Sequence, residues 1–159
     1  MSLINILPWS NLDLYIPDSF YQYFHATENH APMLKSIRFD CSAYEERSNF
    51  QLTCPRLESA ILSFFPIDGT NIQWDNLTHL TLHSMFINDS LLILRKTPRL
   101  VFCKVSGFCT RYGEPSIEAI VLTSLKPLQL AIIVGGFLDN IIAPHLEEFT
   151  FRESTIVCR

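Results

Sequence analysis

The stretch Leu77-Thr-His-Leu80-Thr-Leu82 holds a leucine at its first, fourth and sixth positions, and this pattern recurs along the chain. Five other segments begin with leucine and carry apolar residues at the fourth and sixth positions: 34–39, 57–62, 100–105, 125–130 and 146–151. The first leucines of the six segments are 23, 20, 23, 25 and 21 residues apart. This near-constant period predicts a solenoid, in which successive repeats stack and share one core.

The second half of each segment alternates apolar and polar residues, which is the period of a β-strand. We therefore predict an α/β fold, a leucine-rich-repeat solenoid with one parallel sheet on its concave side and helices or loops on its convex side. We expect a single domain over residues 1–159, with about six to seven repeats and incomplete at both ends. The segment Trp9-Ser-Asn-Leu12 is similar to Trp74-Asp-Asn-Leu77. It predicts a degenerate first repeat in which Leu12 corresponds to Leu77.

The segments between the predicted strands favour helices. Asn88-Asp-Ser opens one helical stretch with cap-type residues, and Arg95 and Lys96 suit its C-terminus before Pro98 ends it. Shorter helices are expected over residues 44–52, 114–122 and 137–142, and an aromatic-rich helix over 17–29. Residues 64–74 should form a loop or one short turn, because they contain a proline and an Asp-Gly pair.

The composition limits the classes of partner. Hydrophobic residues make up 48% of the chain, the formal net charge is −4, and no basic run occurs, so we expect no nucleic-acid partner. The five cysteines include no C-x-x-C pair, which favours buried or unpaired thiols in a reducing compartment over a zinc site. The sequence has no recognisable signal peptide and no apolar run long enough to span a bilayer. We therefore expect a cytoplasmic or nuclear location and no membrane partner.

The third, fifth and seventh positions of each segment should point away from the core, on the concave face. Solenoid proteins usually bind partners on such faces, and aromatic and arginine side chains are common anchors. The candidate partner-binding residues on this face are Arg38, Ile61, His79, Thr81, Phe102, Lys104 and Gln129. Phe102, Arg38 and His79 are the strongest candidates among them.

Catalysis and metal binding find little support in the sequence. It has no nucleophile elbow, glycine-rich phosphate loop or paired-carboxylate motif. His79 and His83 share a strand face but should lie about 13 Å apart, too far to bind one ion. We therefore expect no enzymatic activity, no cofactor and no metal. Two alternatives stay open: a truncated or degenerate gene product without independent function, and an enzyme that lacks a recognisable motif.

The amino-acid sequences of the repeats resemble those of one known family. Ala31-Pro-Met-Leu34-Lys-Ser-Ile37, Cys54-Pro-Arg-Leu57-Glu-Ser and the stretch 74–82 resemble the repeat region of fungal, basidiomycete-type F-box proteins. In that family an F-box binds the adaptor of a cullin-RING ubiquitin ligase, and the repeats receive the substrate. The resemblance implies a protein-protein interaction scaffold that recognises a ubiquitin-ligase substrate, whose identity the sequence does not give.

Two features depart from that family. Residues 1–30 contain no Leu-Pro-x-Glu-like opening of an F-box, so a cullin-RING ligase is an expected partner only if an F-box lies upstream in a longer product. Many leucine-rich repeats place Asn or Cys at the ninth position of the segment. Here that position holds Ser42, Phe65, Met85, Phe108, Ile133 and Ser154. A continuous side-chain ladder that bonds the turns is therefore not expected.

Overall fold

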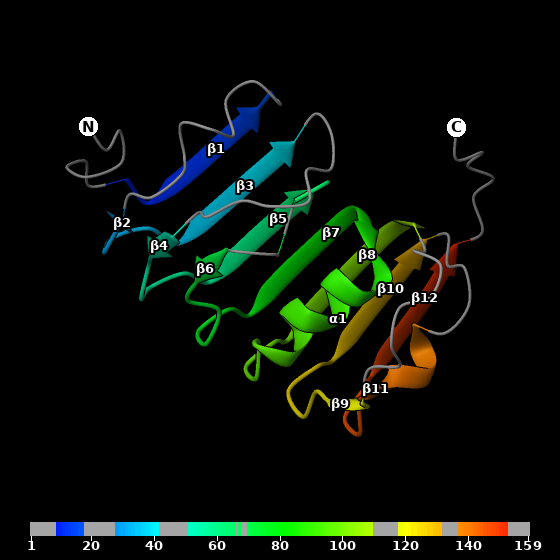
Figure 1. Ribbon diagram of the computed structural model, residues 1–159. Helices are drawn as coiled ribbons and strands as arrows, with labels where there is room; N and C mark the ends of the chain where they lie inside the picture. Colours follow the sequence, from blue (N-terminus) through cyan, green and yellow to red (C-terminus); the bar gives the residue numbers. More distant parts are fainter. Residues whose placement is uncertain are drawn as a thin grey trace.

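A computed structural model describes residues 9–17, 28–41, 51–65, 67, 70–109, 118–131 and 137–152. Seven long strands form one sheet in the order β1-β3-β5-β7-β8-β10-β12, and every neighbouring pair is parallel (Figure 1). The strands are β1 (Asn11–Ile16), β3 (Ser36–Cys41), β5 (Ser59–Ser63), β7 (His79–Phe86), β8 (Phe102–Cys109), β10 (Pro127–Ala131) and β12 (Glu148–Arg152). The protein is thus a parallel-sheet β-solenoid with little helix in its described part, which confirms the predicted solenoid and its parallel sheet.

Shorter elements alternate with the long strands and complete the core. They are β2 (Glu28–His30), β4 (Gln51–Thr53) and β6 (Asn71–Ile72), which form a three-stranded sheet, the pair β9 (Ile120–Val121) and β11 (Ile141–Ile142), the helix α1 (Ile87–Arg95) and the 3-10 turn η2 (Leu138–Asn140). Leu52, Ile72 and Ile120 of the short strands are buried in the same hydrophobic cluster as the residues of the long sheet. One core therefore runs through all the described repeats.

The short elements differ in part from the sequence prediction. Helix α1 confirms the helix expected over 88–96, although it begins at Ile87 and has no side-chain cap. The described ends of the helices expected over 44–52 and 114–122 belong instead to strands β4 and β9, and most of 137–142 forms η2 and β11. Strand β2 occupies the described end of 17–29, and β6 lies within the loop expected over 64–74. Runs of two or three residues are too short for periodicity to separate strand from helix.

A tight turn precedes each long strand after β1. The N–H of Leu57 donates to the carbonyl of Cys54 at 3.1 Å, and the N–H groups of the other five motif leucines donate in the same way to the carbonyl three residues earlier. Proline fits the second position of such a turn because its ring fixes φ, which explains Pro55 and its counterparts at 32, 98 and 144. The turn delivers the leucine into the core, where Leu57 is 0% exposed.

One backbone carbonyl at the start of each long strand connects it to the next repeat. The carbonyl of Lys35 accepts the N–H groups of Glu58 and Ser59, at 2.8 and 3.0 Å. The carbonyls of Ser10, Glu58, Thr78 and Lys126 accept two N–H groups in the same way, and that of Val101 accepts one. Val101 accepts only the N–H of Lys126, because the third position of the next repeat is Pro127, which has no N–H. This ladder fixes the register of the whole sheet.

The first repeat is present, but in a different register from the predicted one. Leu12 pairs with Ile37 and not with the motif leucine Leu34, so the proposed match of Leu12 with Leu77 is wrong by three residues. Trp9 occupies the place of the motif leucine and packs, partly buried, against the core. An indole fills that place in the core as a leucine does elsewhere, which hides the repeat from a leucine pattern.

Three neighbouring strands turn at the same position. Phe64, Ser84 and Gly107 have φ values of 49°, 51° and 65°, and each follows one member of the aligned row Ser63, His83 and Ser106. After this corner Phe65 and Met85 enter the core, where they are 3% and 0% exposed. In these two repeats the ninth position is thus a core position, and the N–H of Phe65 bonds Met85 Sδ at 3.2 Å.

Candidate functional site

The side of the long sheet that faces away from the core, which we name the open face, carries three parallel rows of side chains. The first row is Asn11, Ser36, Ser59, His79, Phe102, Pro127 and Glu148; the centre row is Asp13, Arg38, Ile61, Thr81, Lys104, Gln129 and Thr150; the third row is Tyr15, Asp40, Ser63, His83, Ser106, Ala131 and Arg152. None of these residues is buried. Neighbours in a row are about 4.8 Å apart, the spacing of strands in a sheet.

The structure brings all seven candidate residues onto this one face. Arg38, Ile61, Thr81, Lys104 and Gln129 are consecutive members of the centre row, on strands β3 to β10. His79 and Phe102 are neighbours in the first row, and their rings stack with centroids 5.9 Å apart and planes 26° apart. The candidates therefore form one continuous surface, with the stacked pair beside its centre.

The charge at the β1 end of the centre row is only loosely paired. Arg38 Nε lies 3.9 Å from Asp13 Oδ1, and the two side chains are 54% and 74% exposed. An exposed pair of this kind contributes about 0–1 kcal/mol to stability. A carboxylate on a bound partner could therefore replace Asp13 as the partner of Arg38 at little cost.

His83 lies in the third row among polar and charged side chains. Its Nδ1 and the Ser106 hydroxyl form a short hydrogen bond across β7 and β8. Partial burial lowers the pKa of His83 below its ordinary value of 6.5, and the positive charges of Lys104 and Arg38 lower it further, while Asp40 opposes the shift. The neutral imidazole is therefore favoured on this face, and it forms a hydrogen bond rather than an ion pair.

We expect Lys104→Ala to raise the pKa of His83, because it removes a neighbouring positive charge. The signal of the His83 ring in an NMR titration measures this directly. In the native chain a lowered pKa means that the folded state binds fewer protons than the unfolded state below pH 6.5. His83 therefore contributes stability above pH 6.5 that is lost as the pH falls through its folded pKa. Lys126→Ala, in the turn before β10, is the control, and an equal shift in both variants would refute the assignment.

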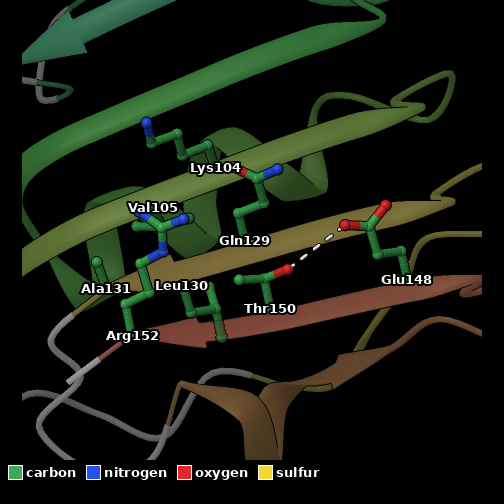
Figure 2. Close-up of a pocket in the computed structure, with 8 residues that line it drawn as sticks. All are labelled: Lys104, Val105, Gln129, Leu130, Ala131, Glu148, Thr150 and Arg152. Atoms are coloured by element: carbon green, nitrogen blue, oxygen red, sulfur yellow. Dashed lines mark hydrogen bonds between the residues drawn. The ribbon is translucent and has the colours of Figure 1, made fainter.

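A shallow hollow of about 340 Å³ lies at the C-terminal end of the open face (Figure 2). Its lining residues are Lys104, Val105, Gln129, Leu130, Ala131, Glu148, Thr150 and Arg152. Glu148 and Arg152 lie toward opposite ends of β12 with Thr150 between them, and Thr150 Oγ1 donates to Glu148 Oε1 at 3.5 Å. The hollow thus presents both signs of charge.

Sequence reasoning did not select several members of this surface. Tyr15 is 66% exposed and lies beside Asp40, but the predicted face included only the six leucine segments and not the first repeat. The apolar alternation of Leu12, Leu14 and Ile16 could have revealed it, because residues between apolar strand positions face the other side. The hollow depends on side chains from three strands, and the sequence holds no local signal for it.

The described thiols lie in the core and not on the open face. Cys41, Cys54 and Cys103 are buried, as predicted for them, whereas the side chains of Cys109 and Cys158 fall outside the described set. Desolvation raises the pKa of Cys103 to about 12 and, against a hydrogen bond from the Gln73 backbone, that of Cys54 to about 11.

The described residues contain neither a metal-binding cluster nor a membrane-spanning helix. Among the ranges named above, no three His, Cys, Asp or Glu residues gather closely enough to hold a metal ion. Within the same ranges, no helix has the length and apolar character needed to cross a membrane.

Comparisons with known proteins returned no relative of this chain. No protein-family model matches it, and searches of curated proteins and of solved structures found no match. Only the fold and the open face therefore bear on the function of this chain.

Proposed function

We propose that this chain is a protein-protein interaction scaffold that binds a partner protein across the open face. One observation carries the proposal: seven parallel strands align their outward side chains in three continuous rows, and none of these residues is buried. A sheet face with no covering layer in the described chain is the typical binding surface of a solenoid.

The charges on the open face favour a protein over a nucleic acid. Its acidic members are Asp13, Asp40 and Glu148, and its basic members are Arg38, Lys104 and Arg152. Nucleic-acid binding needs a surface of one sign, because its affinity comes largely from neutralising phosphates. Interspersed charges of both signs match another protein surface and select the correct partner by complementarity.

The stacked pair of His79 and Phe102 is the proposed anchor. With Ile61 it places two rings and an aliphatic side chain on the neighbouring strands β5, β7 and β8. Binding energy in protein interfaces concentrates in central aromatic and arginine residues that a rim of polar side chains surrounds. In the centre row, Arg38 precedes Ile61 and Lys104 follows Thr81. The two basic side chains therefore lie beside the apolar group, where they can fix the orientation of the partner.

We further propose that the repeats are leucine-rich repeats and that the partner is a substrate of a cullin-RING ubiquitin ligase. Its support is the repeated leucine pattern, together with the resemblance of the segments at 31–37, 54–59 and 74–82 to fungal F-box proteins. The turns before the strands explain why proline recurs shortly before the motif leucine, since proline fits the second position of such a turn.

The binding proposal predicts that Phe102→Ala and Arg38→Glu each weaken partner capture at least about tenfold, the effect of losing roughly 1.4 kcal/mol at an anchor. The purified chain serves as bait, and quantitative mass spectrometry compares the captured proteins with those of the variants. Val121→Ala and Arg56→Glu are matched controls, because both residues are exposed but lie off the open face. A partner retained equally by the open-face variants would contradict the proposal.

The ligase part needs a separate experiment. Fused to an F-box of known adaptor binding, the chain should direct ubiquitin onto the captured partner in a reconstituted reaction, and Phe102→Ala should abolish this transfer. A partner that binds the fusion but is not modified would refute the ligase role and leave the scaffold intact.

A further inference from the structure

In the described part of the chain, β12 is the last strand of the long sheet (Figure 1). Phe149 and Phe151 occupy core positions of their repeat but are 50% and 52% exposed, whereas their row neighbours Leu128 and Leu130 are 2% and 1% exposed. At the other end of the sheet Leu12, in the same row as Phe149, is only 7% exposed. The apolar surface that lacks a neighbour in the described chain is therefore at the β12 end.

No described strand pairs with the outer edge of β12. The N–H of Glu148 donates to the Lys126 carbonyl at 3.1 Å, so the backbone groups of Glu148 point toward β10. Backbone groups alternate in direction along a strand. Those of Phe149 and Phe151 therefore point outward, and an edge strand with unpaired groups is a template for another strand.

The sequence of β12, Glu148-Phe-Thr-Phe-Arg152, is complementary to its own reverse. When two copies of β12 pair antiparallel about Thr150, each Glu148 lies opposite the Arg152 of the other copy. Each Phe149 likewise lies opposite the Phe151 of the other copy. In this register the phenylalanines form the hydrogen-bonded pairs, which matches the outward direction of their backbone groups and gives about four bonds. The charged residues form the pairs in which side chains approach more closely.

We propose that β12 pairs antiparallel with β12 of a second copy of this chain, which forms a two-fold symmetric dimer. Each Glu148 then meets an Arg152 on the open face, and each Phe149 meets a Phe151 on the core side. Within the described part of the chain neither Glu148 nor Arg152 takes part in an ion pair, so both are available. The two open faces join into one continuous surface.

The residues favour this symmetric arrangement over head-to-tail stacking. Continued in the parallel register of the sheet, β12 would place Glu148 beside Asn11 and Arg152 beside Tyr15 of another copy, and neither charge would meet an opposite one. A symmetric interface also closes after two copies, whereas the head-to-tail contact would generate open filaments. Self-complementary charge therefore selects the second copy, in antiparallel orientation, as the occupant.

Sedimentation of the purified chain tests this proposal. We expect a species of twice the 18.3 kDa chain mass. Glu148→Arg and Arg152→Glu should each weaken dimerisation at least tenfold, because both put like charges opposite each other. The double variant should restore the dimer, and so should an equimolar mixture of the two single variants, in which every cross-strand pair is again opposite. This rescue also shows that the single variants are folded.

Arg56→Glu is the matched control, because it reverses an exposed charge that lies before β5, away from β12 and off the open face, and it should leave the dimer unchanged. A monomer at every concentration would overturn the proposal. So would a dimer that both single variants leave intact, or growth into larger assemblies, which head-to-tail contacts predict. Because this experiment needs no binding partner, its outcome is independent of the proposed scaffold function.

Discussion

Replacing Phe39 by alanine is expected to lower the free energy of unfolding by about 3–5 kcal/mol. Phe39 is 0% exposed, and its ring stacks on Phe65 with centroids 5.3 Å apart and planes 14° apart. Alanine would remove buried apolar area and leave a cavity between two repeats, and the neighbouring strands fix the backbone so that the cavity cannot fully collapse. Urea denaturation followed by circular dichroism measures the change.

Tyr15→Ala is the matched control for Phe39→Ala. Tyr15 is also an aromatic strand residue, on the neighbouring strand β1, but it lies on the open face and is 66% exposed. Its replacement should change the free energy of unfolding by only about 0.5 kcal/mol. Equal losses in the two variants would mean that the core is not on the side of the sheet where we place it.

The second large effect is a loss of stability at alkaline pH caused by Cys54 and Cys103. Burial raises the pKa of both thiols from the ordinary 9.0, to about 11 and about 12. Above pH 9 the unfolded chain releases these protons while the folded chain keeps them, so the folded state binds more protons and stability falls as the pH rises. Each thiol should contribute a slope approaching about 1.4 kcal/mol per pH unit between pH 9 and 11.

The double variant Cys54→Ala/Cys103→Ala isolates this effect from other alkaline titrations. Its free energy of unfolding should fall less steeply above pH 9 than that of the native chain, by up to about 2.8 kcal/mol per pH unit for the two thiols. Urea denaturation at a series of pH values gives both slopes. Identical slopes would show that the two thiols ionise in the folded protein as easily as in the unfolded chain.

The long sheet could be predicted from the sequence because its strands repeat a strong local pattern. Leu80 and Leu82, for example, alternate with polar residues and follow a leucine that the preceding turn buries. The seven candidate residues lie together on one face because the same alternation governs every repeat. Their role in binding a partner stays a prediction.

The parts that escaped prediction depend on packing between repeats. Trp9 replaces the motif leucine, so only the register of the carbonyl ladder reveals the first repeat. Strands β4, β6 and β9 exist because a neighbouring short strand is present to pair with them, and two or three residues hold no period of their own. The complementarity of Glu148 and Arg152 becomes visible only once β12 is known to be the edge of the sheet.

The carbonyl ladder also bears on how such a chain can evolve. Each long strand pairs only with the strands before and after it, and each repeat begins with the same backbone connection. Duplication or deletion of one whole repeat would therefore rejoin equivalent ends and preserve the pairing on either side. Such an event would lengthen or shorten the surface by one strand spacing, about 4.8 Å, without altering the chemistry of the remaining rows. Recognition could thus diversify by changing the length of the array as well as by point substitution.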